Sequence, residues 1–254
     1  MFYRRYGPQP ITVVAVHGGP GGPGEVAPLA AALGESGVGV LEPFQSQRTI
    51  DALVAELAGQ IAGSSQGPVA LIGWSWGAWL ATVTAAAHPD LVRTLVLVAS
   101  GPFEEEYAKG IRSTRLARLT ENERALYDRL GKMLVDPHRQ PEAQRILDKT
   151  DQFAPIDTPD PPINFQRDQY EAVWAEAAAL RASGQLIEHL QSVQCPIHAY
   201  HGDHDPHPAE GIRAPLIRWQ PKARFTLLAR CGHKPWRERF VRASFLSELH
   251  DAVR

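Results

Sequence analysis

Residues 68–87 read PVALIGWSWGAWLATVTAAA, in which a short apolar run, a turn with two glycines and a run of small residues follow one another. The run VALI predicts a buried strand, and the small residues 78–87 predict a helix that packs closely on a sheet. Between them, Gly73 to Gly77 fits the pattern G-x-S-x-G. Because the glycines let neighbouring backbone pass close by, we expect Ser75 on a strained strand-to-helix turn. The stretch therefore predicts an α/β chain in which Ser75 is a candidate nucleophile.

The rest of the chain repeats this alternation of short apolar runs with amphipathic segments. Such alternation is typical of a mostly parallel sheet covered by helices on both faces. Apolar residues between Ile50 and Ile61 recur at helical spacing, which predicts a helix between two of the strands. The expected strands are residues 11–16, 38–43, 68–73, 94–99, 196–201 and 224–229.

The strand pattern stops between Phe103 and about His189, and helical signals replace it. Thr120 followed by Glu123 is a capping-box start, and a second helix is expected around residues 170–177. We therefore expect an α/β core formed by residues 1–102 and 190–254, with residues 103–189 inserted as a helical cap.

A serine nucleophile needs a base within hydrogen-bond reach and an acid that holds the base. The expected strand 196–201 is followed by Gly202-Asp203-His204-Asp205-Pro206, and the strand 224–229 by Cys231-Gly232-His233. Both segments fall at the carboxyl ends of parallel strands, where open α/β sheets place their sites. His233 is thus the candidate base, and Asp203 and Asp205 are the candidate acids.

A glycine-rich stretch, HGGPGGPG (residues 17–24), follows the first buried strand. Its glycines leave main-chain N–H groups free to approach an oxyanion, and the N–H of Trp76, directly after the serine, is the expected second donor. A phosphate-binding P-loop is excluded because no Gly-Lys-Ser/Thr follows.

The segments HGGPGGPG, GWSWGA, HGDHDP and CGH, in this order and spacing, resemble the α/β-hydrolase superfamily. HGGPGG together with a tryptophan after the serine resembles its proline iminopeptidase branch. The resemblance covers roughly residues 10–102 and 190–254. It implies a helical cap, no cofactor, and the acid three residues past the glycine of H-G-x-x-D. The residues it implies are Ser75, His233 and Asp205 as a catalytic triad, with Gly19 and Trp76 as the oxyanion hole.

Two features depart from that branch. Only about ten residues precede the first buried strand, so the antiparallel strands that usually open the fold are expected to be missing or reduced to a short edge segment around Tyr3 to Tyr6. The cap stretch Ile163 to Gln166 also lacks the carboxylate with which the peptidases hold a substrate's amino terminus. We therefore expect hydrolysis of a small ester, or of an amide, through an acyl-enzyme on Ser75. The alternatives are a proline iminopeptidase-type aminopeptidase, a carbon-carbon bond hydrolase and a non-catalytic binding protein of this fold.

Six further residues supply aromatic surface and one neutral polar group for an uncharged substrate. For the tryptophans among them, packing in the core is the alternative. The six are Trp74, Asn164, Phe165, Tyr170, Trp174 and Trp236.

A formal net charge of -2 gives no reason to expect nucleic acid or an anionic membrane as a partner. The first ten residues lack the apolar core of a secretion signal, and no run reaches the roughly 18 apolar residues of a membrane span. We expect a cytoplasmic protein that acts on a small molecule; its oligomeric state is left open.

Four histidines recur at every third position from His198 to His207. Alternate side chains of a strand face opposite sides, so these rings do not converge as a zinc site requires, and we expect no metal. His201 is expected beneath the acid loop. Cys195 and Cys231 fall at opposite ends of two strands, so both are expected to be free thiols.

Overall fold

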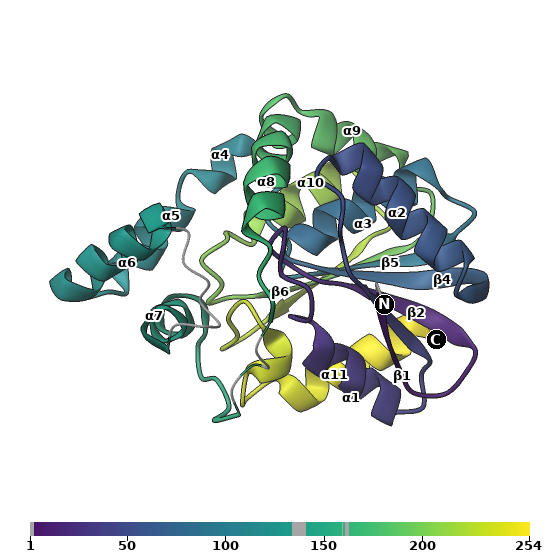
Figure 1. Cartoon of the computed structure of the whole chain (residues 1–254), viewed down its shortest axis with the longest axis horizontal. Helices are drawn as coiled ribbons and strands as arrows, with labels where there is room; N and C mark the ends of the chain where they lie inside the picture. Colours follow the sequence, from purple (N-terminus) through teal and green to yellow (C-terminus); the bar gives the residue numbers. More distant parts are fainter. Residues whose placement is uncertain (1–2, 134–140, 159, 161–162) are drawn as a thin grey trace.

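Figure 1 shows the computed structural model of the chain, which describes residues 3–133, 141–158, 160 and 163–254. Seven strands form one sheet in the order β1-β3-β2-β4-β5-β6-β7. Every neighbouring pair is parallel except β1 and β3, which are antiparallel. The six expected strands and the short edge segment are confirmed. The strands are β1 (Tyr3–Tyr6), β2 (Ile11–Val16), β3 (Val40–Pro43), β4 (Ser65–Trp74), β5 (Val92–Val98), β6 (Ile197–Gly202) and β7 (Arg224–Leu228).

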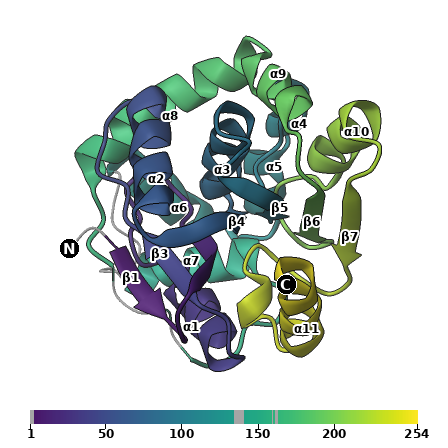
Figure 2. The same cartoon turned by 90° about the vertical axis from the view of Figure 1, so that its right-hand side faces the viewer.

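Helices cover both faces of the sheet, as the alternating pattern predicts. Figure 2 shows α1 (Ala27–Glu35) and α11 (Arg242–Val253) on one face. On the opposite face lie α2 (Ile50–Ala62), α3 (Trp76–Ala87) and α10 (Glu210–Trp219). Each face has its own cluster of buried apolar side chains, so the sheet lies between two hydrophobic layers.

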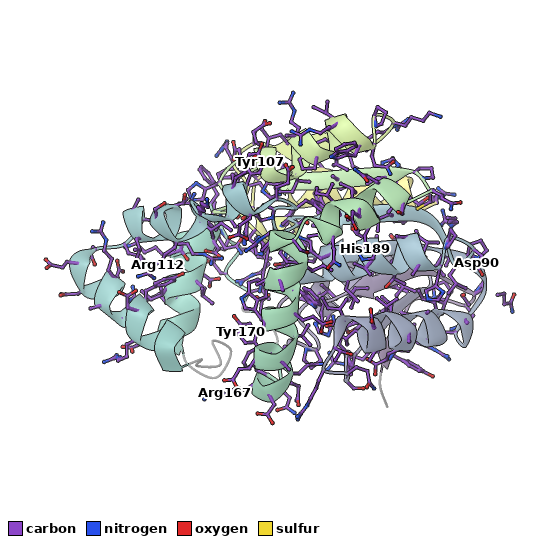
Figure 3. The ribbon with its side chains drawn as sticks, turned by 90° about the horizontal axis from the view of Figure 1, so that it is seen from above. Asp90, Tyr107, Arg112, Arg167, Tyr170 and His189 are labelled. Carbon is purple, nitrogen blue, oxygen red and sulfur yellow. The ribbon has the colours of Figure 1, made fainter. Side chains whose placement is uncertain are left out.

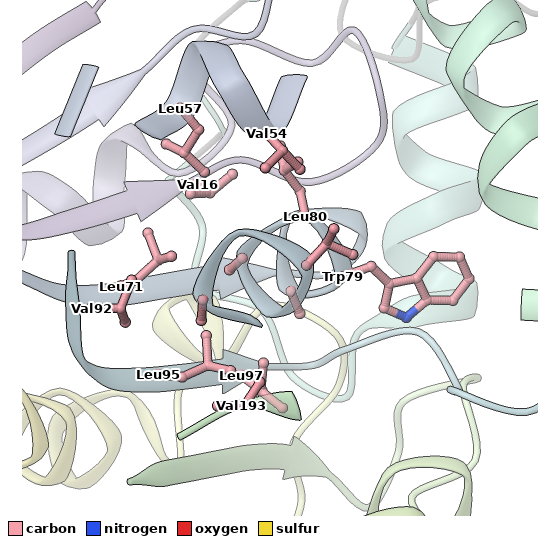
Figure 4. Packing of buried hydrophobic residues seen from close by; sticks show 14 of the residues in the cluster. Val16, Val54, Leu57, Leu71, Trp79, Leu80, Val92, Leu95, Leu97 and Val193 are labelled. Carbon is pink, nitrogen blue, oxygen red and sulfur yellow. The ribbon is translucent and has the colours of Figure 1, made fainter. Parts of the chain in front are cut away.

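Helix α3 lies close against the sheet (Figure 4). Its alanines at positions 78, 81 and 85 are buried, and they belong to the same cluster as Leu71 of β4 and Leu95 of β5. Small side chains on the buried face let the helix backbone approach the strands. The close approach fixes where α3 begins, and therefore where the residue before it lies.

Among the described residues, six helices lie between β5 and β6. Figure 1 shows α5, α6 and α7 extending away from the sheet, whereas α8 and α9 lie near α2 and α3. Glu123 accepts a hydrogen bond from the Thr120 N–H at 2.9 Å, as expected for a capping box. Helix α6 begins at Glu121, directly after Thr120. The six are α4 (Glu105–Ala108), α5 (Ile111–Ala117), α6 (Glu121–Met133), α7 (Pro141–Asp151), α8 (Arg167–Ala182) and α9 (Gln185–Ser192).

Within the described residues, no helix is both long enough and apolar enough to cross a bilayer. Cys195 and Cys231 are free thiols, as predicted. A short 3-10 turn, η1 (Pro235–Arg237), follows β7 and leads the chain into α11.

Candidate active site

Ser75 lies at a sharp turn between β4 and α3. Its φ of 57° and ψ of -120° fall outside the conformations that residues with side chains ordinarily adopt. A Cβ atom on Gly73 would lie 2.2 Å from the Gly77 carbonyl oxygen, and one on Gly77 would lie 2.4 Å from that of His17. Both positions therefore require glycine, which is the physical reason for the G-x-S-x-G spacing.

Two loops that are distant in sequence bring a histidine and a carboxylate to Ser75. His233 follows β7, and its Nε2 lies 3.0 Å from Ser75 Oγ. Its Nδ1 lies 2.7 Å from Oδ2 of Asp205, in the loop after β6. Because an ionised carboxylate only accepts hydrogen bonds, the neutral form of His233 carries its proton on Nδ1 and presents a bare Nε2 to the serine hydroxyl. The three side chains form one continuous hydrogen-bonded chain.

The two aspartates of the loop after β6 have different surroundings. Asp203 accepts a hydrogen bond from the Cys231 N–H at 3.2 Å. The Asp205 side chain is buried, and burial alone would raise its pKa, but the histidines that face it hold this pKa well below the usual value. Those histidines are His233, His207 and His201. Asp205 is therefore an ionised partner for His233, whereas Asp203 holds the neighbouring loop.

The glycine-rich loop and the start of α3 both border Ser75. A Cβ atom on Gly18 would lie 3.2 Å from the Cβ atom of Ser75, and the next residue, Gly19, has a positive φ of 22°. Trp76 is the first residue of α3, so its main-chain N–H has no acceptor within the helix. The two residues predicted to bind an oxyanion thus come from segments that flank the serine.

Two of the six residues predicted to bind substrate are buried beside the loop that carries His233. Trp74 and Trp236 are 4% and 2% exposed, and their rings meet edge to face at 5.3 Å. Trp74 Nε1 donates a hydrogen bond to the His233 carbonyl oxygen at 2.8 Å, and its ring centroid lies 5.2 Å from that of His233. Their contacts are with the core and the histidine loop, which matches the packing alternative.

The aromatic residues of α8 form a row with Trp79 of α3. The Trp174 ring lies parallel to that of Trp79 at 6.2 Å and to that of Tyr170 at 6.1 Å. Phe165 continues the row, 5.6 Å from Tyr170. The sequence reasoning missed Trp79, although a large ring four residues after Ser75 in a small-residue helix was an available signal. The row joins the exposed ring of Trp174 on α8 to the buried ring of Trp79 on α3.

Asn164 and Phe165 also line a pocket of about 790 Å³ beside the glycine-rich loop. The stretch that carries them is fixed to this loop, because the Gln166 N–H donates to the Gly21 carbonyl oxygen at 2.7 Å. Asn164 itself is exposed. Figure 3 shows Tyr170 on α8, across from the group of helices that carries Arg112.

Several acidic side chains of the helical segment are paired with basic ones. Asp151 contacts the histidine loop through its main chain, and both its carboxylate oxygens accept from Arg115, at 2.8 and 2.6 Å. Burial would raise the pKa of Asp151, but the charge and hydrogen bonds of Arg115 lower it. Asp160 accepts from Lys234 and Arg237 of the same loop. The surface pairs include Asp168 with Arg48, Glu171 with Arg167, Glu105 with Arg181 and Glu104 with Arg218.

Glu238 is a buried carboxylate that the sequence reasoning did not single out. Its Oε1 accepts from the N–H groups of Phe153 and Gly232, both at 2.8 Å, and its Oε2 from that of Ala154 at 2.7 Å. It therefore joins the segment after α7 to the loop that carries His233. No local pattern signals these contacts, because 84 positions separate Glu238 from Ala154.

We expect Glu238→Gln to lower the melting temperature by about 3 to 10 °C, because the amide nitrogen would face a main-chain N–H and leave it without an acceptor at a cost of about 1–3 kcal/mol. Thermal unfolding followed by circular dichroism measures this. Glu35→Gln, at an exposed position of α1, is the matched control and should shift the temperature by less than about 2 °C. Equal shifts in the two variants would contradict this account of Glu238.

Three nitrogen and oxygen atoms, from Asp205, His207 and His233, lie within 4.8 Å of one another, which raises the question of a metal. Both Nδ1 atoms are already engaged, at 2.8 and 2.7 Å from the two oxygens of Asp205. Ligands of a tetrahedral zinc ion, about 2.1 Å from the metal, lie about 3.4 Å apart. These shorter contacts fit hydrogen bonds better than shared coordination.

The family of the chain follows from a comparison with known proteins. A model of the alpha/beta hydrolase family matches residues 13–243, and the chain belongs to that family. A pimeloyl-[acyl-carrier protein] methyl ester esterase of Neisseria meningitidis is 36% identical over 69 residues, which span 26% of this chain and 27% of that protein. The match therefore spans about a quarter of the length of this curated relative.

Solved structures share the fold over nearly the whole chain. VinJ is similar with a TM-score of 0.70 and 19% identity, covering 99% of this chain and 95% of its own. A proline iminopeptidase of Mycobacterium smegmatis gives a TM-score of 0.66 and 20% identity, covering 98% and 94%. At these identities the likeness concerns the fold, and it confirms the predicted α/β-hydrolase architecture.

Proposed function

We propose that this hydrolase cleaves small carboxylic esters through an acyl-enzyme on Ser75. The observation that carries the proposal is the hydrogen-bonded chain from Ser75 Oγ to His233 Nε2 at 3.0 Å and from His233 Nδ1 to Asp205 at 2.7 Å. A serine hydroxyl is a weak nucleophile, and a neutral histidine held in this tautomer is the base that activates it.

In the proposed reaction Ser75 Oγ attacks the ester carbonyl carbon while His233 Nε2 takes the hydroxyl proton. The negative charge on the carbonyl oxygen is stabilised by the main-chain N–H groups of Gly19 and Trp76, helped by the positive end of the α3 dipole. The protonated His233 gives its proton to the departing alcohol. It then removes a proton from the water that cleaves the acyl-enzyme, which returns Ser75 to its starting state.

The helical segment of residues 103–189 is the proposed cap over this site, and α8 supplies its aromatic surface. Phe165, Tyr170 and Trp174 suit an uncharged acyl or aromatic group. The Neisseria relative is named as a methyl ester esterase, which supports ester rather than amide substrates for this chain.

The paired carboxylates argue against an iminopeptidase-type activity. Holding a protonated amine in a buried site requires a carboxylate whose charge is available to it, since an unpaired buried charge costs several kcal/mol. The acidic residues nearest the histidine loop, Asp151 and Asp160, already bind Arg115 and Lys234.

We expect kcat/KM for a short-chain nitrophenyl ester to exceed that for a prolyl arylamide by at least about 100-fold, since two orders of magnitude correspond to about 2.8 kcal/mol of transition-state binding. The two substrates are compared on the same enzyme preparation by the colour of the released nitrophenol and arylamine. A clear advantage for the arylamide would replace the esterase by the aminopeptidase.

A further inference from the structure

His207 lies against the candidate triad, although it belongs to none of its three positions. Its ring is stacked on that of His233, with centroids 4.6 Å apart and planes inclined by 27°. Its main-chain N–H and its Nδ1 both reach Asp205 Oδ1, at 2.9 and 2.8 Å. His201 supports it from below, with Nε2 2.8 Å from the His207 carbonyl oxygen. One carboxylate is therefore shared by two histidine rings, each on its own oxygen.

The geometry fixes the proton of His207. An imidazole nitrogen 2.8 Å from a carboxylate oxygen must carry hydrogen, because two lone pairs would repel each other, so the proton lies on Nδ1. Burial lowers the pKa of His207 to about 4, against the opposing pull of Asp205, so the ring is neutral around pH 7. His207 thus donates one hydrogen bond to the acid without adding a second positive charge beside His233.

We propose that His207 is a positioning residue of the reaction: it holds Asp205 in the rotamer that orients His233 and covers one face of the His233 ring. This inference rests on the proposed function, because it assigns His207 a role through the base and the acid of that reaction. With both oxygens of Asp205 engaged, the carboxylate cannot turn away when His233 takes up the serine proton. The stacked His207 ring prevents the His233 ring from tilting towards His207.

The same contact changes how strongly Asp205 attracts protonated His233. A donor on Asp205 Oδ1 spreads the negative charge of the carboxylate, so the attraction felt by protonated His233 is weaker than it would be from a carboxylate without that donor. Removing the donor should therefore strengthen the attraction between the carboxylate and protonated His233. The acidic limb of the pH profile of kcat/KM reports this group, because the base must be unprotonated to act. Among the described residues, other charged and titratable groups also interact with these rings or with Asp205: Arg115 with His207, Asp151 with His233, and His201 and Arg118 with Asp205.

Two substitutions separate the hydrogen bond from the stacked ring. His207→Phe keeps a ring and removes the donor, whereas His207→Asn keeps a donor near the Nδ1 position and removes the ring. We expect His207→Phe to lower kcat by about 10- to 100-fold with KM within about twofold, and to move the acidic limb up by about 0.5 pH unit or more. His207→Asn should retain the pH limb of the wild type and more of kcat than the phenylalanine variant. His204→Phe is the matched control, because His204 lies in the same loop but its ring meets that of Phe153 edge to face.

A proton NMR experiment tests the contact without any substrate. The hydrogen-bonded Nδ1 proton of His233 should give a low-field resonance in the wild type, in His207→Asn and in His204→Phe, and this resonance should shift or broaden in His207→Phe. If it shifts while the wild type cleaves no ester, the positioning role stands and the proposed function fails. If both the resonance and the pH limb are unchanged in His207→Phe, the positioning role is wrong.

Discussion

Replacing Ser75 by alanine is expected to lower kcat by at least about 10³-fold, the loss typical of a removed nucleophile. The substitution removes one hydroxyl and leaves the glycine-rich loop and the start of α3 in place. The free energy of unfolding should therefore change by less than about 1 kcal/mol. Ester hydrolysis and denaturant unfolding, measured on the same preparation, check both parts of this expectation.

The control for this experiment is Ser100, a buried serine that belongs to none of the three triad positions. Ser100 follows β5 and donates its hydroxyl to the Gly101 carbonyl oxygen at 2.8 Å. Ser100→Ala should retain activity and should still be labelled by a fluorophosphonate, which reacts with an activated serine, whereas Ser75→Ala should not be labelled. Turnover near that of the wild type in Ser75→Ala would refute the acyl-enzyme.

Asp205→Asn is the second large effect, with an expected loss in kcat of about 10²- to 10⁴-fold. An asparagine can present its nitrogen to His233, which would favour the proton on Nε2 and leave no base for the serine. Asp203→Asn is the matched control, because Asp203 accepts only from the Cys231 N–H among the contacts described above. Its loss should stay below about tenfold. The reverse ranking of the two variants would assign the acid to Asp203.

Much of the fold can be predicted from local sequence patterns. Buried parallel strands are nearly continuous apolar runs, so six of the seven strands stand out, and the seventh is the short edge segment at Tyr3 to Tyr6. The positions of Ser75, Asp205 and His233 also follow from local order, because each lies within five residues of the end of a strand. Parallel strands bring their carboxyl ends to one edge of the sheet, and this converts three separated motifs into one cluster.

The residues that support this cluster could not be predicted in the same way. Glu238 acts through the main-chain N–H groups of Phe153 and Ala154, and such contacts leave no trace in the identity of the partner residues. Arg115 and Asp151 pair across 36 positions in a segment where charged residues are common, so their periodicity resembles that of any solvated helix. The spacing of His198 to His207 argued against convergence, yet the turn after β6 folds His207 back onto the acid.

The three hydrogen bonds of Glu238 bear on how this protein could be recombined with its relatives. Insertions between two strands of a conserved sheet are natural points of exchange, and a helical segment attached only at its two ends could be replaced as a cassette. Here the end of α7 is hydrogen-bonded to the histidine loop. In addition to the bonds of Glu238, the His233 N–H donates to the Asp151 carbonyl oxygen at 2.7 Å. A chimera that takes residues 103–189 from another hydrolase would therefore disturb its own base unless residues 151–154 and Glu238 are inherited together.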